Sequence, residues 1–353
     1  MKGLLCCISI LMSLHSFAGT NDSTLYTASD KRIQYTGRVD HSNITGPVIW
    51  APGAYIDLAF EGSYCILEIN DELRWGKSHN YIIVIVDDLA PRRIQLKERS
   101  NRIVLAEKLT PGKHHVTICK STEAEIGFIQ PTAFIAKKIS RPSRKPKRKI
   151  EFIGDSITCG MGNDESGKAC GKGEWYDQNN AWIAYGPLTA RHFNAQWHLS
   201  SISGIGLMHS CCNKTTVMPP LFKKLGLSAD SIAWNFKRYQ PDVVTVCLGQ
   251  NDGIQDSAAF CKAYIDFMQA LRSYYPKATL VMLTSPMAAA ELNVFLQKSI
   301  LSVEQALQKK DRKITHYFFR RQYTTGCSSH PSGNDHHMIA AELIPFVEKQ
   351  MRW

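Results

Sequence analysis

The hydrophobic and polar positions of the chain follow one pattern before about residue 140 and another after it. In the first part, short apolar runs rich in β-branched residues alternate with turn residues; the runs cover 47–60, 64–70, 81–88, 102–109, 114–120 and 126–136. Turn signals such as Asn70-Asp71 and Pro111-Gly112 separate some of these runs. Short strands at this spacing, without a 3.6-residue apolar period, are typical of an antiparallel sandwich. We therefore predict an all-β sandwich domain of about eight strands over residues 19–140.

Strand patterns alternate with helix patterns in the second part, residues 149–353. The strand candidates are 149–154, 197–203, 242–249, 278–285 and 313–320, and the helix candidates are 181–192, 257–275, 289–310 and 332–351. Four of these strands are continuous apolar runs, as expected for strands that are buried on both faces. The pattern predicts an α/β domain with a parallel sheet and helices on both faces. Ligands of such sheets bind beyond the carboxyl ends of the strands.

Polar or small residues occur where three of the predicted strands end. Ser156 follows the first strand, Gly204 follows the second and Asn251 follows the third, while His330 lies just before the last predicted helix. An acyl-transfer site needs a hydroxyl nucleophile, an imidazole that takes its proton and donors around the oxyanion. These segments contain all three components.

Each of these residues also has a simpler structural interpretation. Ser156 could cap a helix, Gly204 could serve a turn, Asn251 could form an Asx turn, and His330 could be a loop residue before a proline. Taken singly, Gly204 fits the simpler interpretation, and so does Asn251. The four segments together favour the catalytic interpretation.

The strings at these positions resemble a known superfamily. Gly-Asp-Ser-Ile-Thr at 154–158, Ser-Ile-Ser-Gly at 201–204, Gly-Gln-Asn-Asp at 249–252 and His-Pro-Ser at 330–332 are similar to the four blocks of SGNH (GDSL-type) hydrolases. A small β-sandwich in front of that domain resembles carbohydrate esterase family 2, as do the longer strings at 154–162 and 184–191. Four ordered blocks on predicted strand ends are far more specific than one Gly-Asp-Ser.

The resemblance implies a role for each residue. Ser156 would be the nucleophile and His330 the general base. The backbone N–H groups of Ser156 and Gly204 and the side-chain amide of Asn251 would form the oxyanion hole. The implied fold is a flavodoxin-like sheet preceded by a jelly-roll-like sandwich.

The implied function is that of an exported serine esterase that removes O-acetyl groups from carbohydrate. Fragments of acetylated xylan, mannan or glucomannan would be substrates, acetylated at the hexose 6-position, and no cofactor would be needed. The alternatives are a lipase-like or thioesterase-like member of the superfamily and a carbohydrate-binding protein that has lost activity.

The sequence departs from the superfamily beside the histidine. An aspartate usually lies three residues before it, or two before it in this esterase family, where it orients the imidazole. Cys327 and Ser328 occupy these positions here. We therefore predict a Ser-His dyad in which a backbone carbonyl orients His330. Asp335, five residues later, is expected to face solvent or to cap the last helix, with a role as a substitute third member as the alternative.

Composition and charge limit the remaining classes. Of the 353 residues, 44% are hydrophobic and 21% are charged, which fits a globular protein with two domains. Residues 1–18 have the pattern of a secretory signal peptide, and no later segment is apolar for long enough to span a membrane. The net charge of +11 is concentrated in a basic, proline-containing linker at 141–148 and in Lys149 after it. Without interleaved aromatic residues this linker does not indicate nucleic-acid binding.

Cysteine, histidine and aromatic residues give weaker signals. Nine of the eleven cysteines lie beyond the signal segment, and Cys159 and Cys170 could pair across a glycine-rich loop. Histidines near His330 lack the spacing of a zinc site, so we expect no metal. Trp175, Tyr176 and Asp155 are candidates for substrate contact; for the two aromatic residues, core packing is the alternative.

Overall fold

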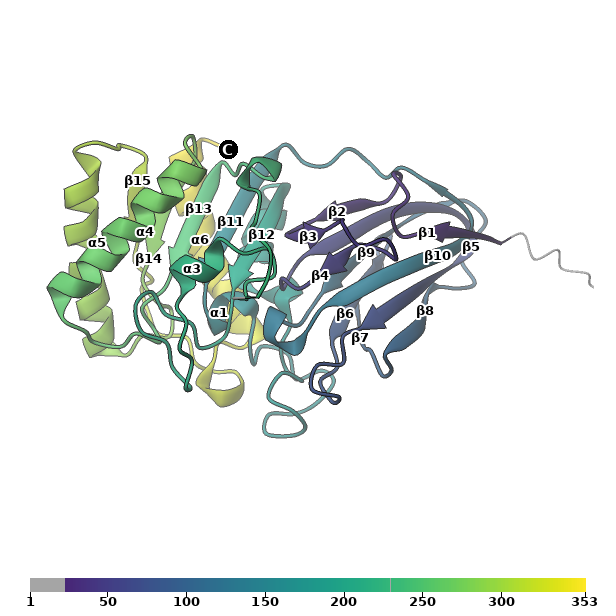
Figure 1. Ribbon diagram of the computed structural model, residues 1–353, viewed down its shortest axis with the longest axis horizontal. Coiled ribbons are helices and arrows are strands. Elements are labelled where there is room, and N and C mark those ends of the chain that lie inside the picture. The colour runs from purple at the N-terminus through teal and green to yellow at the C-terminus, as the bar shows by residue number, and fades with distance from the viewer. Residues whose placement is uncertain (1–22, 229) are drawn as a thin grey trace, which may run out of the picture.

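The computed structural model describes residues 23–228 and 230–353, which form two β-sheets of different construction (Figure 1). The predicted signal segment, residues 1–18, lies outside the described residues. Within the described part of the chain, no helix combines the length and apolarity that crossing a membrane requires.

The first sheet is antiparallel. Its strands are β1 (Thr24–Thr27), β2 (Gln34–Thr36), β3 (Val39–Asp40), β4 (Val48–Ile49), β5 (Tyr55–Asp71), β6 (Tyr81–Val86), β7 (Arg92–Gln95), β8 (Ser100–Ala106), β9 (Lys113–Lys120) and β10 (Ile129–Ser140). Strand β5 pairs with β9 along its first half, with β8 along its second half and with β10 over most of its length. Its buried side chains alternate with less buried ones and line the core of the sandwich. This architecture confirms the predicted β-sandwich.

The second sheet is parallel and has the strand order β12-β11-β13-β14-β15. Its strands are β11 (Arg148–Gly154), β12 (Ala195–Ser201), β13 (Val243–Cys247), β14 (Thr279–Leu283) and β15 (Ile314–Tyr317). The order is 2-1-3-4-5 when strands are numbered along the domain, which is the flavodoxin-like arrangement. The predicted α/β fold with a parallel sheet is therefore confirmed.

Helices cover both faces of the parallel sheet. They are α1 (Ser156–Cys159), α2 (Tyr185–His192), α3 (Met218–Phe222), α4 (Ser257–Tyr274), α5 (Ala290–Gln308) and α6 (Gly333–Met351). Short 3₁₀ turns lie at η1 (Ala124–Ile126), η2 (Ala181–Ile183), η3 (Phe236–Arg238) and η4 (Cys327–Ser329). Helices α4 and α5 share one hydrophobic core with the sheet, and α2 and α6 share the core on the other side.

The register of the parallel sheet brings the predicted site segments together. Gly154, the last residue of β11, lies opposite Ser201 of β12 and Cys247 of β13. The chain therefore leaves three adjacent strands at the same edge of the sheet. The segments that carry Ser156, Gly204 and Asn251 begin at this edge.

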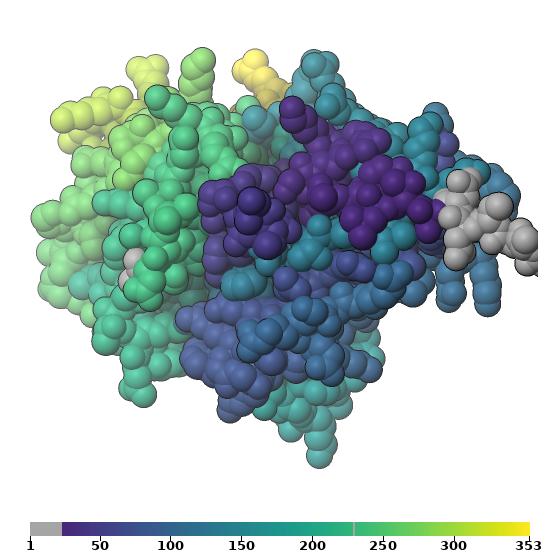
Figure 2. All heavy atoms as spheres, turned by 45° about the vertical axis from the view of Figure 1, so that its right-hand side comes forward, coloured from purple at the N-terminus to yellow at the C-terminus, as the bar shows by residue number. Residues whose placement is uncertain are grey.

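The two domains pack directly against each other (Figures 1 and 2). The ring of Trp197 in β12 stacks on Tyr55 of β5, with ring centroids 4.2 Å apart. Arg38, fully buried, donates from Nη1 to the backbone oxygen of Phe222 at 2.6 Å and from Nη2 to Oε1 of Glu151 at 3.1 Å. Because a buried charge must be paired, this contact fixes the sandwich against β11 and the C-terminal end of α3.

Candidate active site

Ser156 lies at the start of α1, directly after β11. The carboxylate of Asp155 caps this helix by accepting a hydrogen bond from the N–H of Ile157 at 3.1 Å. The helix ends at once because Gly160 has a φ of +78°. Asp155, and not Ser156, is therefore the N-cap. The hydroxyl of Ser156 is left for another partner.

That partner is His330. Its Nε2 lies 2.9 Å from Oγ of Ser156, although 174 residues separate the two in the chain. Its Nδ1 lies 3.0 Å from the backbone oxygen of Ser328. A carbonyl oxygen can only accept, so Nδ1 carries the hydrogen in the neutral ring and Nε2 is the acceptor for the serine hydroxyl. The structure thus brings together the two residues that were predicted as nucleophile and base.

The surroundings of His330 favour the neutral form of its ring. Burial lowers the pKa of His330 below its usual value, and the bond to the Ser328 carbonyl opposes only part of this shift. A neutral imidazole at neutral pH can accept a proton, as a general base must.

The histidine segment is held by residues that are distant in sequence. Ser328 and Ser329 both have left-handed backbone conformations, with φ of 52° and 56°. Cys327 is disulfide-bonded to Cys170, and its N–H donates to the backbone oxygen of Gly162 at 2.9 Å. The unusual backbone is therefore imposed by tertiary contacts.

The disulfide differs from the pairing considered from the sequence. Cys170 bonds to Cys327 and not to Cys159. Cys159 is a buried free thiol whose Sγ lies 3.0 Å from Oε2 of Glu123. Within the described residues, the group of potential metal ligands comprises Glu165, Cys170 and Cys327. The sulfurs of Cys170 and Cys327 are bonded to each other.

Asp335 caps helix α6. Its carboxylate accepts from the N–H of Ser332 at 3.2 Å and from the N–H and hydroxyl of Thr325 at 2.8 and 2.7 Å. The residue is almost completely buried, so the capping interpretation is confirmed and the solvent-facing one is wrong. Its contacts stabilise both ends of the segment that carries His330.

The backbone N–H groups of Ser156 and Gly204 are available to bind an oxyanion. Neither of them has a hydrogen-bond acceptor within residues 23–228 and 230–353. Gly204 has a φ of +75°, and a side chain there would lie 3.0 Å from the sulfur of Cys211. The glycine is therefore required for the local conformation as well as for access to its N–H.

Asn251 reaches the same region through its side chain. Its Nδ2 donates to the Ile205 backbone oxygen at 2.9 Å and to Oδ2 of Asp155 at 3.2 Å. These partners come from neighbouring segments, unlike those of an Asx turn. An oxyanion would have to replace one of these two acceptors or share the Nδ2 donor with it.

The neighbouring Asp252 accepts from three successive N–H groups, those of Leu207, Met208 and His209, and so fixes the loop that follows Gly204.

Asp155 lies behind the serine. It is fully buried, and burial raises its pKa to about 7, with the Asp252 carboxylate adding to the rise. Because it is covered by protein and bonded to Asn251, its position does not suit the contact with substrate that was considered from the sequence.

Comparisons with known proteins match both domains. Residues 35–146 match the family model "Carbohydrate esterase 2 N-terminal", and residues 152–316 match "GDSL-like Lipase/Acylhydrolase family". An acetylxylan esterase / glucomannan deacetylase of Cellvibrio japonicus is 28% identical over 93% of this chain and 94% of its own length. The chain therefore resembles a carbohydrate esterase of family 2, with an N-terminal domain of that family in front of a GDSL-like hydrolase domain.

Solved structures of similar proteins match both domains of this chain. A family two carbohydrate esterase from Cellvibrio japonicus has a TM-score of 0.86 at 26% identity, covering 94% of this chain and 98% of that one. One from Clostridium thermocellum, in complex with cellohexaose, has a TM-score of 0.83 at 27% identity, covering 91% and 99%. The cellulase/esterase CelE of Acetivibrio thermocellus is 29% identical over 94% of this chain but only 41% of its own length. The similarity to these relatives over nearly the whole chain identifies it as a carboxylic ester hydrolase of the carbohydrate esterase type.

The catalytic pocket of this esterase has a volume of about 270 Å³. It is lined by Ser156, His330, Gly204 and Asn251 together with Met161, Trp175, Ser203, Cys211, Cys212, Lys214 and Glu125. Cys211 and Cys212 are joined in a disulfide between adjacent residues. All the predicted catalytic and oxyanion residues thus line the same pocket.

The two aromatic candidates for substrate contact differ in position. Trp175 is 44% exposed and lines the catalytic pocket. Tyr176 is buried with Tyr81 and Ile126, and its hydroxyl accepts from the N–H of His79 at 3.2 Å. The core-packing alternative is therefore correct for Tyr176.

Sequence reasoning missed the residues that reach the site from the sandwich. Glu123 accepts at Oε2 from the N–H of Ser203 at 2.7 Å, and Glu125 forms an ion pair with Lys214. Glu123 lies just before η1 and Glu125 lies within it, and nothing in the local sequence distinguishes either from a surface glutamate. Asp252, by contrast, could have been found from the sequence, because it belongs to the Gly-Gln-Asn-Asp string at 249–252.

Proposed function

We propose that this esterase removes O-acetyl groups from carbohydrate by means of a Ser156–His330 dyad. The observation that carries the proposal is the pair of contacts made by His330, with the serine hydroxyl at Nε2 and the Ser328 carbonyl at Nδ1. The match to carbohydrate esterases supports the class of substrate.

In the first half of the reaction, Nε2 takes the hydroxyl proton while Oγ attacks the acetyl carbon. The oxyanion that forms accepts from the N–H groups of Ser156 and Gly204 and from the Asn251 amide. The imidazolium then protonates the sugar oxygen as the ester bond breaks. An acetyl group remains on Ser156, and the sugar leaves with a free hydroxyl.

Water completes the cycle through the same base. His330 removes a proton from water, which attacks the acetyl carbon, and the imidazolium returns that proton to Oγ as the bond to Oγ breaks; acetic acid leaves and ionises to acetate in solution. The Ser328 carbonyl keeps the ring in one orientation through both halves. As a dipole without a full charge, it stabilises the imidazolium less than a carboxylate would.

Acetylated xylan and glucomannan are the proposed substrates, because relatives that match nearly the whole chain are named for deacetylating them. The proposed position is O6 of the hexose. Export is the proposed location, based on the sequence pattern of residues 1–18.

The test is acetate release from acetylated glucomannan and xylan, with the deacetylated position mapped by NMR. A parallel assay compares acetyl and octanoyl esters of 4-nitrophenol. We expect acetate release and a clear preference for the acetyl ester. Preference for the octanoyl ester would favour a lipase-type hydrolase. A folded protein that no fluorophosphonate labels at Ser156 would favour a binding protein without activity.

A further inference from the structure

A second pocket, with a volume of about 570 Å³, lies between the two domains and is larger than the catalytic pocket; we call it the interdomain cleft. Trp50, Glu72, Arg74 and Trp75 line it from the sandwich, and Leu227 and Asp230 are among the residues that line it from the hydrolase domain. Glu125 and Lys214 line both this interdomain cleft and the catalytic pocket. A ligand long enough to leave the catalytic pocket over this ion pair would enter the interdomain cleft.

The interdomain cleft contains an exposed tryptophan. Trp75 is 70% exposed and lies in a turn where its own φ is 55° and that of Leu73 is 50°. Left-handed conformations are costly for such residues and persist where the surroundings impose them. The guanidinium of Arg74 lies 4.8 Å from the centroid of the Trp75 ring. This fold therefore maintains a solvent-facing indole that contributes little to the core.

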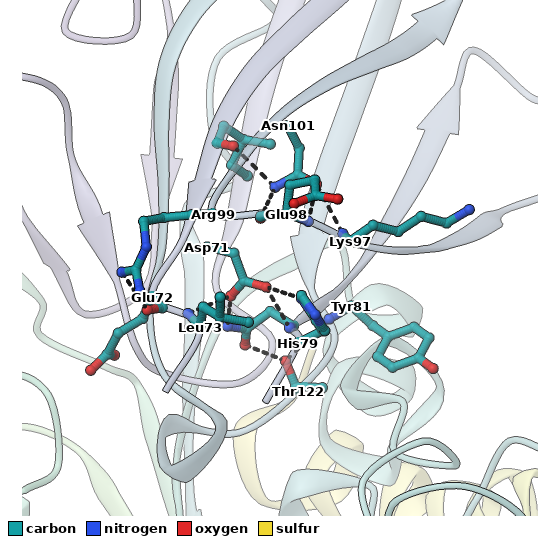
Figure 3. Close-up of polar contacts among 12 residues, drawn as sticks. Asp71, Glu72, Leu73, His79, Tyr81, Lys97, Glu98, Arg99, Asn101 and Thr122 are labelled. Atoms are coloured by element: carbon teal, nitrogen blue, oxygen red, sulfur yellow. Dashed lines mark hydrogen bonds and ion pairs between the residues drawn. The ribbon is translucent and has the colours of Figure 1, made fainter. Parts of the chain in front are cut away.

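The base of the turn is fixed by a buried carboxylate (Figure 3). Asp71 accepts at Oδ1 from Nδ2 of Asn80 at 2.7 Å, and its Oδ2 lies 3.2 Å from the Asn80 N–H and 3.1 Å from Nδ1 of His79. The two ends of the 71–80 loop are thus held together. Trp75 is presented on a closed loop and needs little further ordering to bind a ligand.

We propose that the interdomain cleft binds the sugar residues next to the acetylated one in a polysaccharide. This inference rests on the proposed function and extends it to the chain that carries the acetyl group. The indole offers an apolar surface for the C–H face of a pyranose ring, and the carboxylates of Glu72 and Asp230 accept from sugar hydroxyls. The sandwich would therefore bind substrate in addition to supporting the hydrolase domain.

Affinity for a β-1,4-linked glucomannan hexasaccharide without acetyl groups, measured by isothermal titration calorimetry, tests this proposal. Trp75→Ala should weaken binding about tenfold, and Trp75→Phe should weaken it less, because a phenyl ring keeps part of the stacking surface. Leu25→Ala is the matched control: Leu25 is also exposed but lies on β1, away from the interdomain cleft, and its replacement should leave the affinity unchanged.

Kinetics separate this proposal from the proposed function. For Trp75→Ala, the ratio of kcat/KM on acetylated glucomannan to kcat/KM on 4-nitrophenyl acetate should fall about tenfold. Wild-type protein that does not bind the hexasaccharide, or Trp75→Ala that binds within twofold of wild type, would overturn the interdomain cleft as a sugar site. Binding with no hydrolysis of either ester would contradict the proposed function and leave the sugar site standing.

Independent of the interdomain cleft, a buried glutamate joins the sandwich to the catalytic segments. Glu123 is 1% exposed, and its Oε2 accepts from the Ser203 N–H at 2.7 Å and from the Cys159 thiol at 3.0 Å. Oε1 is also buried and has no hydrogen-bond partner within the described residues. Burial raises the pKa of Glu123, and the Glu125 carboxylate adds to the rise.

The contacts of Glu123 fall on both sides of the oxyanion site. Ser203 precedes Gly204, and Cys159 lies three residues after Ser156 on α1. From these contacts we infer that Glu123 is a positioning residue, which holds the N–H groups of Ser156 and Gly204 at the separation that one oxyanion requires. A misplacement of about 1 Å in such a site costs on the order of a hundredfold in rate.

Glu123→Ala should lower kcat on 4-nitrophenyl acetate at least about tenfold with KM within threefold, because the loss falls on the transition state. Glu123→Gln keeps an oxygen acceptor for both donors and should restore most of kcat. Glu151→Gln is the matched control, since Glu151 is a buried carboxylate that also joins the domains, through Arg38, but lies outside the pocket. It should lower the melting temperature and leave kcat within twofold.

The rate of labelling by a fluorophosphonate gives a second readout, because its phosphoryl oxygen uses the same N–H groups. It should slow in Glu123→Ala in proportion to kcat. Equal losses of kcat in Glu123→Ala and Glu151→Gln would mean that the effect is structural and would overturn the assignment. A Glu123→Ala protein with kcat within threefold of wild type would do the same.

Discussion

The segment that carries Ser156 and the segment that carries His330 meet at one hydrogen bond but are built differently. Around Ser156, a strand end, the Asp155 cap and Gly160 define the backbone within seven residues. Around His330, the conformation depends on Gly162, Asp335 and the disulfide from Cys170. The position of the serine is therefore specified locally, whereas the position of the histidine also depends on contacts with the loop at 162–170, which is distant in the chain.

This difference extends to the electrostatics. The serine lies next to Asp155, and burial of Asp155, together with the nearby Asp252 carboxylate, raises the pKa of the Asp155 carboxyl to about 7. The Nδ1 atom of His330 donates to a backbone carbonyl, and burial lowers the pKa of the ring. We expect changes in the serine segment to remove chemical steps, and changes in the histidine segment to alter geometry and pH dependence.

Replacing Ser156 with alanine should have the largest effect. Without Oγ no acetyl-enzyme can form, so kcat on 4-nitrophenyl acetate should fall by about ten-thousand-fold or more. The short helix and its Asp155 cap remain, so the melting temperature should change little. A Ser156→Ala protein that keeps a tenth of the wild-type rate would show that the hydroxyl is not the nucleophile.

Replacing Asn251 with alanine should come next. Loss of one oxyanion donor costs about a hundredfold in kcat. Asn213→Ala, at an exposed position that does not line the catalytic pocket, is the control and should behave as wild type. A loss below threefold for Asn251→Ala would indicate that its amide stays with Asp155 and Ile205 during the reaction.

Removing the disulfide tests the histidine segment. The Cys170–Cys327 bond closes a loop with a sequence separation of 157, so the double change to serine should lower the free energy of unfolding by about 4 kcal/mol. We expect kcat to fall about tenfold, because Ser328 and His330 lose an anchor. Unfolding in urea and kcat measured on the same preparation check both effects. Unchanged kcat would mean that Gly162 and Asp335 suffice.

The pH profile should give the smallest effect. His330 is active as the neutral ring, so kcat/KM should fall as the pH drops through its pKa, which burial places below the usual value of about 6.5. Ser328→Asp puts a carboxylate near the ring, favours the imidazolium and should move this fall to higher pH. A profile that is flat from pH 5 to 8 would contradict the role of His330 as base.

Much of the fold could be predicted because the pattern of each element is local. The apolar runs that form β11, β13 and β14 are buried on both faces of the sheet, as their composition indicates. The ends of β11, β12 and β13 share one sheet edge because parallel strands with this register must end together. The meeting of Ser156, Gly204 and Asn251 in one pocket was predictable for that reason.

The sequence by itself determined the order of the elements, the class of each sheet and the identity of the groups at the strand ends, since each depends on residues a few positions apart. Only the tertiary structure decided which backbone carbonyl accepts from His330, namely that of Ser328, that Cys170 pairs with Cys327 and that Glu123 reaches Ser203 from the other domain. The disulfide and the glutamate contact join residues 157 and 80 positions apart. The carbonyl contact spans two residues but requires a backbone that distant contacts impose. Local patterns carry no signal for such contacts, because the free energy that selects them comes from packing the whole chain.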